Sequence, residues 1–346
     1  MLEKVEFKNF KMLRDATLPL SPFTLIVGPN ASGKSTALEA MRRGAVAIYT
    51  ASAADLNRDR YLSIGASPES RIDVTFYGAK STPGWYGGTL SPQLTFRGSG
   101  IPSQILTRSG DLVRNRPNDP LALTLGGITH YALDARKISE PVLLTPAAML
   151  ALDGSGLAVV LDRMRDNFPE RFKAINLEIA KWLPDYDEIL FETPSDGLRA
   201  IAMRPRDNHN RKIKAADLSD GTLIALALLT LAYLPIPPSI ITIEEPDRGI
   251  HPRLLRRLQD AFYRLSYPES VGESRAPVQV IATTHSPYFL ELFKEHPEEI
   301  VIAEKQGLTA TFTQLSKHPH IDEILEDAPL GDAWYSGILG GVPTES

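Results

Sequence analysis

One segment near the amino terminus, residues 28–35, restricts the fold of this 346-residue chain more than any other feature. It reads Gly-Pro-Asn-Ala-Ser-Gly-Lys-Ser and fits the pattern G-x-x-x-x-G-K-[ST]. An apolar run over 23–27 precedes it, and a helical pattern over 34–49 follows. In this strand–loop–helix context, backbone N–H groups and the helix N-terminus can surround a phosphate. Residue frequencies give a chance match in about one in a hundred chains of this length. The sequence therefore predicts a nucleotide-binding α/β fold.

The residues of this loop have expected roles toward a nucleotide. Lys34 would neutralise β- and γ-phosphate oxygens, the Ser35 hydroxyl would ligate Mg²⁺, and Thr36 could reach the α-phosphate. ATP and Mg²⁺ are therefore the expected ligands. The full set of expected nucleotide-binding residues in this loop is Gly28, Asn30, Ala31, Ser32, Gly33, Lys34, Ser35 and Thr36.

Two carboxylates follow a second apolar run, Ser-Ile-Ile-Thr-Ile over 239–243. At the carboxyl end of a buried strand, Glu244 is expected on the metal side and Glu245 beside the attacking water. Acidic residues at a strand end are common and usually only solvated. Beside a phosphate-binding loop, the functional interpretation becomes the stronger one.

Two further motifs each allow a structural and a functional interpretation. The segment 218–222, Leu-Ser-Asp-Gly-Thr, precedes a long apolar helix, so Ser219 is a good helix N-cap. The functional alternative is that Ser219 and the Gly221 backbone address a phosphate presented by another subunit. His285 ends the next core strand and could hydrogen-bond a γ-phosphate, whereas a lone histidine is usually structural.

Together these motifs resemble the ABC-type ATPase heads of the RecF, SMC and overcoming-lysogenization-defect groups, and most closely the stand-alone predicted ATPases called AAA_21. The order of the motifs matches: phosphate loop, LS-x-G signature, Walker B carboxylates and switch histidine. The resemblance implies that catalysis involves Lys34, Glu245 and His285, and that Ser35 and Glu244 hold the metal. It also extends to segments 9–11, 153–158, 249–252 and 331–335.

The chain departs from the common ABC pattern at three points. Glu244 stands where most ABC proteins have Asp, and Asp220 stands where transporters have Gly in the signature. No glutamine can be assigned to the Q-loop, and Gln104 is not adopted for that role.

The expected fold is an α/β P-loop NTPase with an ABC-ATPase-like core sheet flanked by helices. Residues 1–50 and 218–346 are expected to form the ATP-binding core. Residues 51–217 would form an inserted lobe, with antiparallel strands over 72–77 and 90–96, an exposed loop over 98–119 and a small helical part. No heptad pattern is present, so no coiled-coil arm is expected.

The composition excludes several classes of protein and site. The chain contains no cysteine, which excludes disulfide scaffolds, Cys-ligated metal sites and thiol nucleophiles. A formal net charge of −5 argues against a protein that is basic throughout, although arginines and lysines gather over 204–214 and 253–257. These clusters could contact nucleic acid or could simply be solvated. The longest apolar run, over 223–234, is too short to cross a membrane, so we expect a cytoplasmic protein.

Three functions fit these motifs. The first is an ATPase that forms a homodimer around ATP and serves a nucleic-acid or defence process. The second is a nucleotide-gated scaffold that holds or releases a partner effector such as a nuclease, because no separate acidic effector module follows residue 300. The third, a transporter ATPase, is disfavoured by Asp220 and the unassigned Q-loop.

Overall fold

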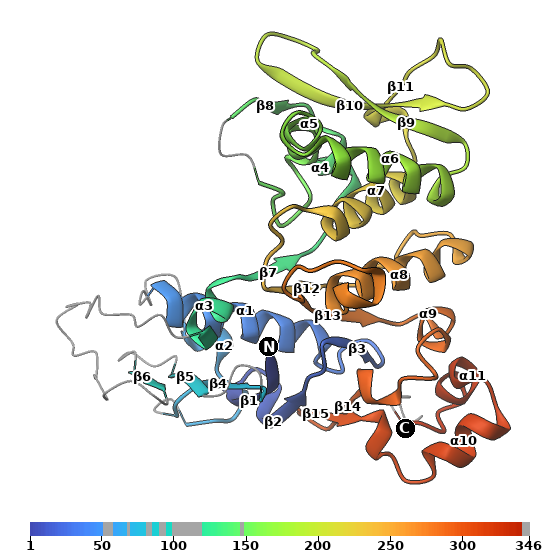
Figure 1. Ribbon diagram of the computed structural model, residues 1–346. Helices are drawn as coiled ribbons and strands as arrows, with labels where there is room; N and C mark the ends of the chain where they lie inside the picture. Colours follow the sequence, from blue (N-terminus) through green and yellow to red (C-terminus); the bar gives the residue numbers. More distant parts are fainter. Residues whose placement is uncertain are drawn as a thin grey trace. The chain divides into compact units, whose positions relative to one another are not determined.

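The computed structural model describes residues 1–50, 58–67, 70–80, 85–89, 95–98, 120–145 and 149–340. They belong to two compact units (Figure 1). Unit 1 contains Met1–His130, Pro238–Thr242 and Arg275–Ser346, and unit 2 contains Tyr131–Pro237 and Ile243–Ser274.

Unit 1 is built on two β-sheets. Its strands are β1 (Leu2–Phe10), β2 (Leu13–Pro19), β3 (Phe23–Val27), β4 (Asp73–Gly78), β5 (Trp85–Thr89), β6 (Thr95–Gly98), β7 (Ile128–Tyr131), β12 (Ile240–Ile243), β13 (Gln279–Thr284), β14 (Ile300–Gln306) and β15 (Thr309–Gln314). Its helices are α1 (Lys34–Thr50), α2 (Arg58–Tyr61), α3 (Pro120–Gly126), α9 (Pro287–Glu291), α10 (Ile321–Asp327) and α11 (Leu330–Tyr335). The last residues of β7 and β12 lead into unit 2.

The six-stranded sheet has the order β15-β14-β3-β13-β12-β7. Strand β3 is parallel to both of its neighbours, β13 and β14. All five of its residues, Phe-Thr-Leu-Ile-Val, are buried, as expected for a strand covered on both faces. The loop that follows β3 therefore begins at the centre of the sheet's carboxyl edge, where α/β proteins commonly bind ligands.

The five-stranded sheet, β2-β1-β4-β5-β6, is antiparallel. Val5, Phe7 and Phe10 of β1 are fully buried. They join one hydrophobic cluster with Leu38 and Met41 of α1 and with Phe76 of β4. Burial of apolar surface stabilises a fold by about 25 cal/mol per Å². This cluster therefore fixes α1 against the sheet.

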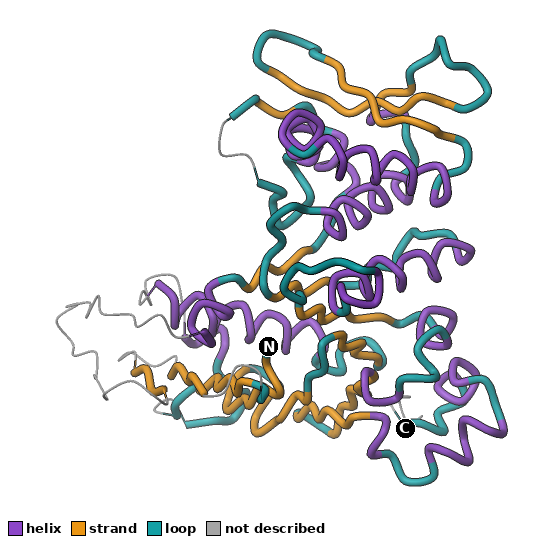
Figure 2. The backbone as a smooth tube through the Cα atoms, viewed as in Figure 1, coloured by secondary structure: helices purple, strands orange, loops and turns teal. Residues whose placement is uncertain are grey.

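Unit 2 combines helices with a smaller antiparallel sheet. Its elements are α4 (Ala135–Ser139), β8 (Val142–Leu143), α5 (Leu157–Asn167), α6 (Pro169–Trp182), β9 (Tyr186–Glu192), β10 (Leu198–Pro205), β11 (Ile213–Lys214), α7 (Asp220–Tyr233) and α8 (Leu255–Ser266). Strand β10 pairs with β8, β9 and β11. Helices α5 and α6 pack against the β9–β10 pair (Figure 2). Helix α7 is apolar on all sides because it packs against α4, α6 and α8.

Most of the predicted elements are confirmed, including the strand over 23–27, the helix beginning at Lys34, the helix over 219–234 and the hairpin around Gly307. Of the strand predicted over 90–96, residues 95 and 96 belong to β6, and residues 90–94 lie outside the described residues. The loop predicted over 98–119 falls, apart from residue 98 at the end of β6, outside them as well. Among the described residues, the longest helix has 17 residues, and no helix is long and apolar enough to cross a membrane.

The two units divide the chain differently from the predicted core and lobe. Strand β4 lies in unit 1 because it pairs with β1, and α7 lies in unit 2 because it packs against α4 and α6. As a statement about functional domains, the division at residues 50 and 217 stays a prediction.

Candidate functional site

The loop between β3 and α1 has the backbone conformation that a phosphate-binding nest requires. Ala31 has a φ of 59° and Gly33 a φ of 101°, in the left-handed region. Alternation of left- and right-handed residues turns successive N–H groups toward one concave side. Gly28 leaves no room for a side chain, because a Cβ there would overlap the carbonyl oxygen of Ala303 on β14. The glycines of the motif are thus required by close approach and by backbone conformation.

Lys34 lies within this loop and not in solvent. The residue is 5% exposed, and its Nζ donates to the carbonyl oxygens of Gly28 at 2.8 Å and Pro29 at 2.9 Å. The Ser32 side chain is buried, and its Oγ has no hydrogen-bond partner among the described residues. The loop thus contains an ammonium group and an unpaired hydroxyl, and both could donate hydrogen bonds to the oxygens of a bound phosphate.

His285 follows the strand beside the phosphate loop. In the parallel pair β3–β13, Val27 is in register with Thr284. Gly28 and His285 are the next residues of the two strands, so both loops leave the same edge of the sheet side by side. Unit 1 therefore places the start of the phosphate loop and His285 at the same edge of the sheet, and the role of His285 toward a phosphate stays a prediction.

Glu244 and Glu245 directly follow β12, which is the neighbour of β13 in the sheet order. The Glu244 N–H donates to the carbonyl oxygen of Tyr131 at 3.2 Å, and burial raises the pKa of the Tyr131 phenol to about 12. Glu245 has a φ of 43°, which a residue with a side chain rarely adopts. Its carboxylate lies 3.9 Å from the exposed guanidinium of Arg248. No pattern in the sequence indicated this strained conformation.

Ser219 is the N-cap of α7. Its Oγ accepts from the Thr222 N–H at 3.2 Å and lies 2.8 Å from the Thr222 hydroxyl. Gly221 approaches the segment after the carboxylates so closely that a Cβ would overlap the Gly249 carbonyl oxygen. Unit 2 therefore brings the signature segment against the turn that follows Glu245. The structural role of Ser219 is observed, and its role toward a phosphate stays a prediction.

The segment 153–158 is a tight turn that begins α5. Gly154 and Gly156 have φ values of 86° and 85°, and the Asp153 carboxylate accepts from the Ser155 N–H at 2.9 Å. This hydrogen bond lowers the pKa of Asp153. Side chains on either glycine would meet Ile138 or the Met149 carbonyl, so the motif is explained by local packing.

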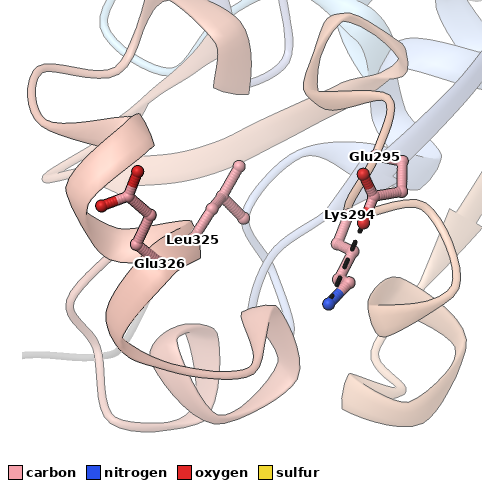
Figure 3. A pocket seen from close by; sticks show the side chains of 4 residues that line it. All are labelled: Lys294, Glu295, Leu325 and Glu326. Atoms are coloured by element: carbon pink, nitrogen blue, oxygen red, sulfur yellow. Dashed lines mark ion pairs between the residues drawn. The ribbon is translucent and has the colours of Figure 1, made fainter.

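A pocket of about 450 Å³ lies elsewhere in unit 1, between the turn after α9 and helix α10. Figure 3 shows its lining residues, Lys294, Glu295, Leu325 and Glu326, with Lys294 and Glu295 forming an ion pair at 3.9 Å. The pocket contains none of the predicted site residues.

Two family models match the chain. Residues 130–291 match AAA_21, described as "AAA domain, putative AbiEii toxin, Type IV TA system", and residues 1–43 match AAA_15, described as "AAA ATPase domain". A curated relative, the OLD nuclease of Thermus scotoductus, is 23% identical over 334 residues. The match covers 84% of this chain and 60% of the nuclease, so the chain spans less than two thirds of that protein's length.

Solved structures of SMC heads share the fold. A crystal structure of an SMC head bound to the C-winged helix domain of ScpA has a TM-score of 0.60 and 19% identity, covering 90% of this chain and 96% of that one. The SMC head domain from Thermotoga maritima has a TM-score of 0.50 and 17% identity, covering 90% and 98%. The predicted fold class is thereby confirmed.

Proposed function

Because these matches support an ABC-type ATPase of the group that includes RecF, SMC and OLD proteins, we propose that the chain binds ATP with Mg²⁺ and hydrolyses it as a homodimer formed around the nucleotide. The observation that carries the proposal is the conformation of the phosphate loop, with its left-handed Ala31 and Gly33 and its buried Lys34.

The residues of the loop fit ATP and Mg²⁺ chemically. Phosphate oxygens would replace the two carbonyl oxygens that Lys34 now contacts, and they would give the Ser32 hydroxyl an acceptor. The described residues contain no group of three His, Asp or Glu side chains able to hold a metal unaided. Ser35 and Glu244 would therefore share Mg²⁺ with phosphate oxygens and water, as Mg²⁺ usually requires.

The proposed chemistry assigns different roles to two neighbouring carboxylates. Glu244 would stabilise the metal, and Glu245 would orient the attacking water and accept its proton. His285, on the edge of the sheet beside the phosphate loop, would hydrogen-bond the terminal phosphate. Preorganised charges of this kind stabilise the transferring phosphoryl group without further rearrangement.

Two substitutions test this division. Glu245→Gln keeps the shape but removes the base, so turnover should fall by about 10²-fold or more while ATP binding persists. Glu244→Gln should weaken binding itself, because the metal ligand is lost. Phosphate release and ATP-dependent thermal stabilisation measure the two effects separately. Glu269→Gln, at an exposed glutamate, is the control for loss of one charge.

Lys34→Ala provides the reference for a chain without the loop cation. We expect it to melt near the wild-type temperature without ligand and to gain no stabilisation from Mg-ATP. If Lys34→Ala is stabilised as strongly as the wild type, the phosphate loop is not the nucleotide site. If both glutamate variants hydrolyse ATP normally, the hydrolytic site lies elsewhere.

A second function is favoured by the similarity to an OLD nuclease that is longer than the matched region. In this alternative, ATP binding orders a dimer that holds or releases a partner nuclease, and slow hydrolysis acts as a timer. The purified chain should then leave DNA and RNA intact in Mg²⁺ or Mn²⁺. If the purified chain alone cleaves nucleic acid, and every site variant still does so, the result counts against a separate partner nuclease.

A further inference from the structure

The segment 331–335, Gly-Asp-Ala-Trp-Tyr, has no role in the proposed chemistry. It makes up all but the first residue of helix α11, which packs directly against α9 in unit 1. Helix α9 begins at Pro287, two residues after His285. The segment thus lies against the loop that carries the proposed phosphate-sensing histidine.

Two contacts join α11 to this loop. The Gly331 N–H donates to Oε2 of Glu291, the last residue of α9, at 3.0 Å. A Cβ on Gly331 would lie 2.6 Å from the Pro287 carbonyl oxygen and 3.2 Å from the Pro287 Cβ. Since no real Cβ comes within 3.0 Å of a backbone atom, only glycine lets the two segments approach this closely. Leu330 and Ala333, at 0% and 1% exposure, fix α11 in the core beneath.

The residue between His285 and Pro287 is also fixed by hydrogen bonds. The Ser286 N–H donates to the Thr284 hydroxyl at 2.9 Å, and the Ser286 Oγ accepts from the Phe289 N–H at 3.2 Å. His285 therefore lies between β13, which is fixed in the sheet, and Pro287, which is fixed by α11. A displacement of Pro287 would therefore be passed through Ser286 to the backbone of His285.

We propose that Gly331 and Glu291 are positioning residues for His285, and that α11 sets the place of the histidine loop relative to the phosphate loop. The inference rests on the role proposed for His285. It explains why a glycine opens the segment and why an acidic side chain ends α9. Positioning matters because an error of about 1 Å in a reacting group can cost about 10²-fold in rate.

The test compares Gly331→Ala and Glu291→Ala with His285→Ala in phosphate-release assays. Each positioning variant should lower kcat about tenfold or more and change KM for ATP by about twofold or less, because the phosphate loop is unchanged. Glu291→Gln keeps an acceptor oxygen for the Gly331 N–H and should retain most of the turnover. In the His285→Ala background, Glu291→Ala should cause no further loss, since both changes act through one group.

Two matched controls remove the effects of charge and stability. Glu295→Ala removes an exposed glutamate four residues after Glu291 and should keep turnover. Gly272→Ala adds a methyl group to a left-handed glycine with open space around it, in unit 2, and should lower only the melting temperature. If Glu291→Ala does not fold, Gly331→Ala is compared with Gly272→Ala in the same way.

The outcomes separate this inference from the proposed function. The positioning role is overturned if Gly331→Ala and Glu291→Ala keep the wild-type kcat. It is also overturned if Glu291→Ala lowers kcat further in the His285→Ala background. A wild-type kcat in His285→Ala overturns it as well, but the proposed ATPase function is retained if Lys34→Ala is inactive. Undiminished turnover in Lys34→Ala would instead overturn the proposed function.

Discussion

Two residues with side chains, Ala31 and Glu245, hold the left-handed backbone conformation within proposed functional segments. Such conformations cost about 1–3 kcal/mol each and persist where the surrounding structure imposes them. Ala31 turns the phosphate loop toward its concave side. Glu245 turns the chain immediately after a buried strand, which directs its carboxylate differently from that of Glu244. At both positions strain accompanies a proposed function.

We expect Ala31→Val to weaken ATP binding. A β-branched residue is a genuine outlier in the left-handed region, and the loop can relieve the added strain only by losing its concave shape. Ala31→Gly accepts the same conformation without strain and should bind ATP like the wild type. Titration with a fluorescent ATP analogue measures the affinities.

Ala216→Val, at an exposed position outside the left-handed region, is the control for the added methyl groups. If Ala31→Val binds the analogue as tightly as Ala216→Val, the backbone conformation of the loop is not important for binding.

At the scale of elements, the amino end of α7 is fixed by the segment that follows Glu245. Gly221 contacts the Gly249 carbonyl without space for a side chain, and Ser219 caps the helix. The segment after Glu245 and the amino end of α7 are therefore in direct contact within unit 2. This contact gives a physical reason why the signature segment contains glycine two residues after its serine.

Gly221→Ala should destabilise the protein, although alanine is favoured over glycine inside a helix by about 0.5–1 kcal/mol. The overlap with the Gly249 carbonyl costs about 1–3 kcal/mol, which exceeds that gain. Thermal unfolding decides the sign: a lower melting temperature supports the close contact, and a higher one shows that helix propensity prevails and the contact relaxes.

At the scale of the whole molecule, the proposed dimer would give Ser219 a second role. Within one chain its hydroxyl is explained by capping of α7, because it already accepts the Thr222 N–H. A role in the partner's nucleotide site would be additional. The two roles respond differently to a negative charge, since carboxylates are good N-caps and repel phosphates.

Ser219→Asp should therefore keep the melting temperature of the wild type and lose the ATP-dependent dimer. Ser219→Ala should lose about 1 kcal/mol of stability through the missing cap and dimerise more readily than Ser219→Asp. Sedimentation velocity with a non-hydrolysable ATP analogue reports the dimer. A Ser219→Asp chain that still dimerises around the analogue would leave capping as the whole function of this residue.

The sequence by itself determined the local features of the protein. The phosphate loop, the buried strand before it and the helix after it follow from eight consecutive residues and their flanks. The N-cap at Ser219 and the turn at Gly307 also follow from neighbouring residues, because capping and hairpin turns depend on side chains within a few positions.

Only the tertiary structure decided which distant segments meet. The register that sets His285 beside Gly28, the pairing of β4 with β1, and the contacts of Gly221 with Gly249 and of Gly331 with Pro287 join residues far apart in the chain. The left-handed conformation of Glu245 belongs with them. Local propensity carries no information about these contacts, since they are selected by burial and close packing of the whole unit.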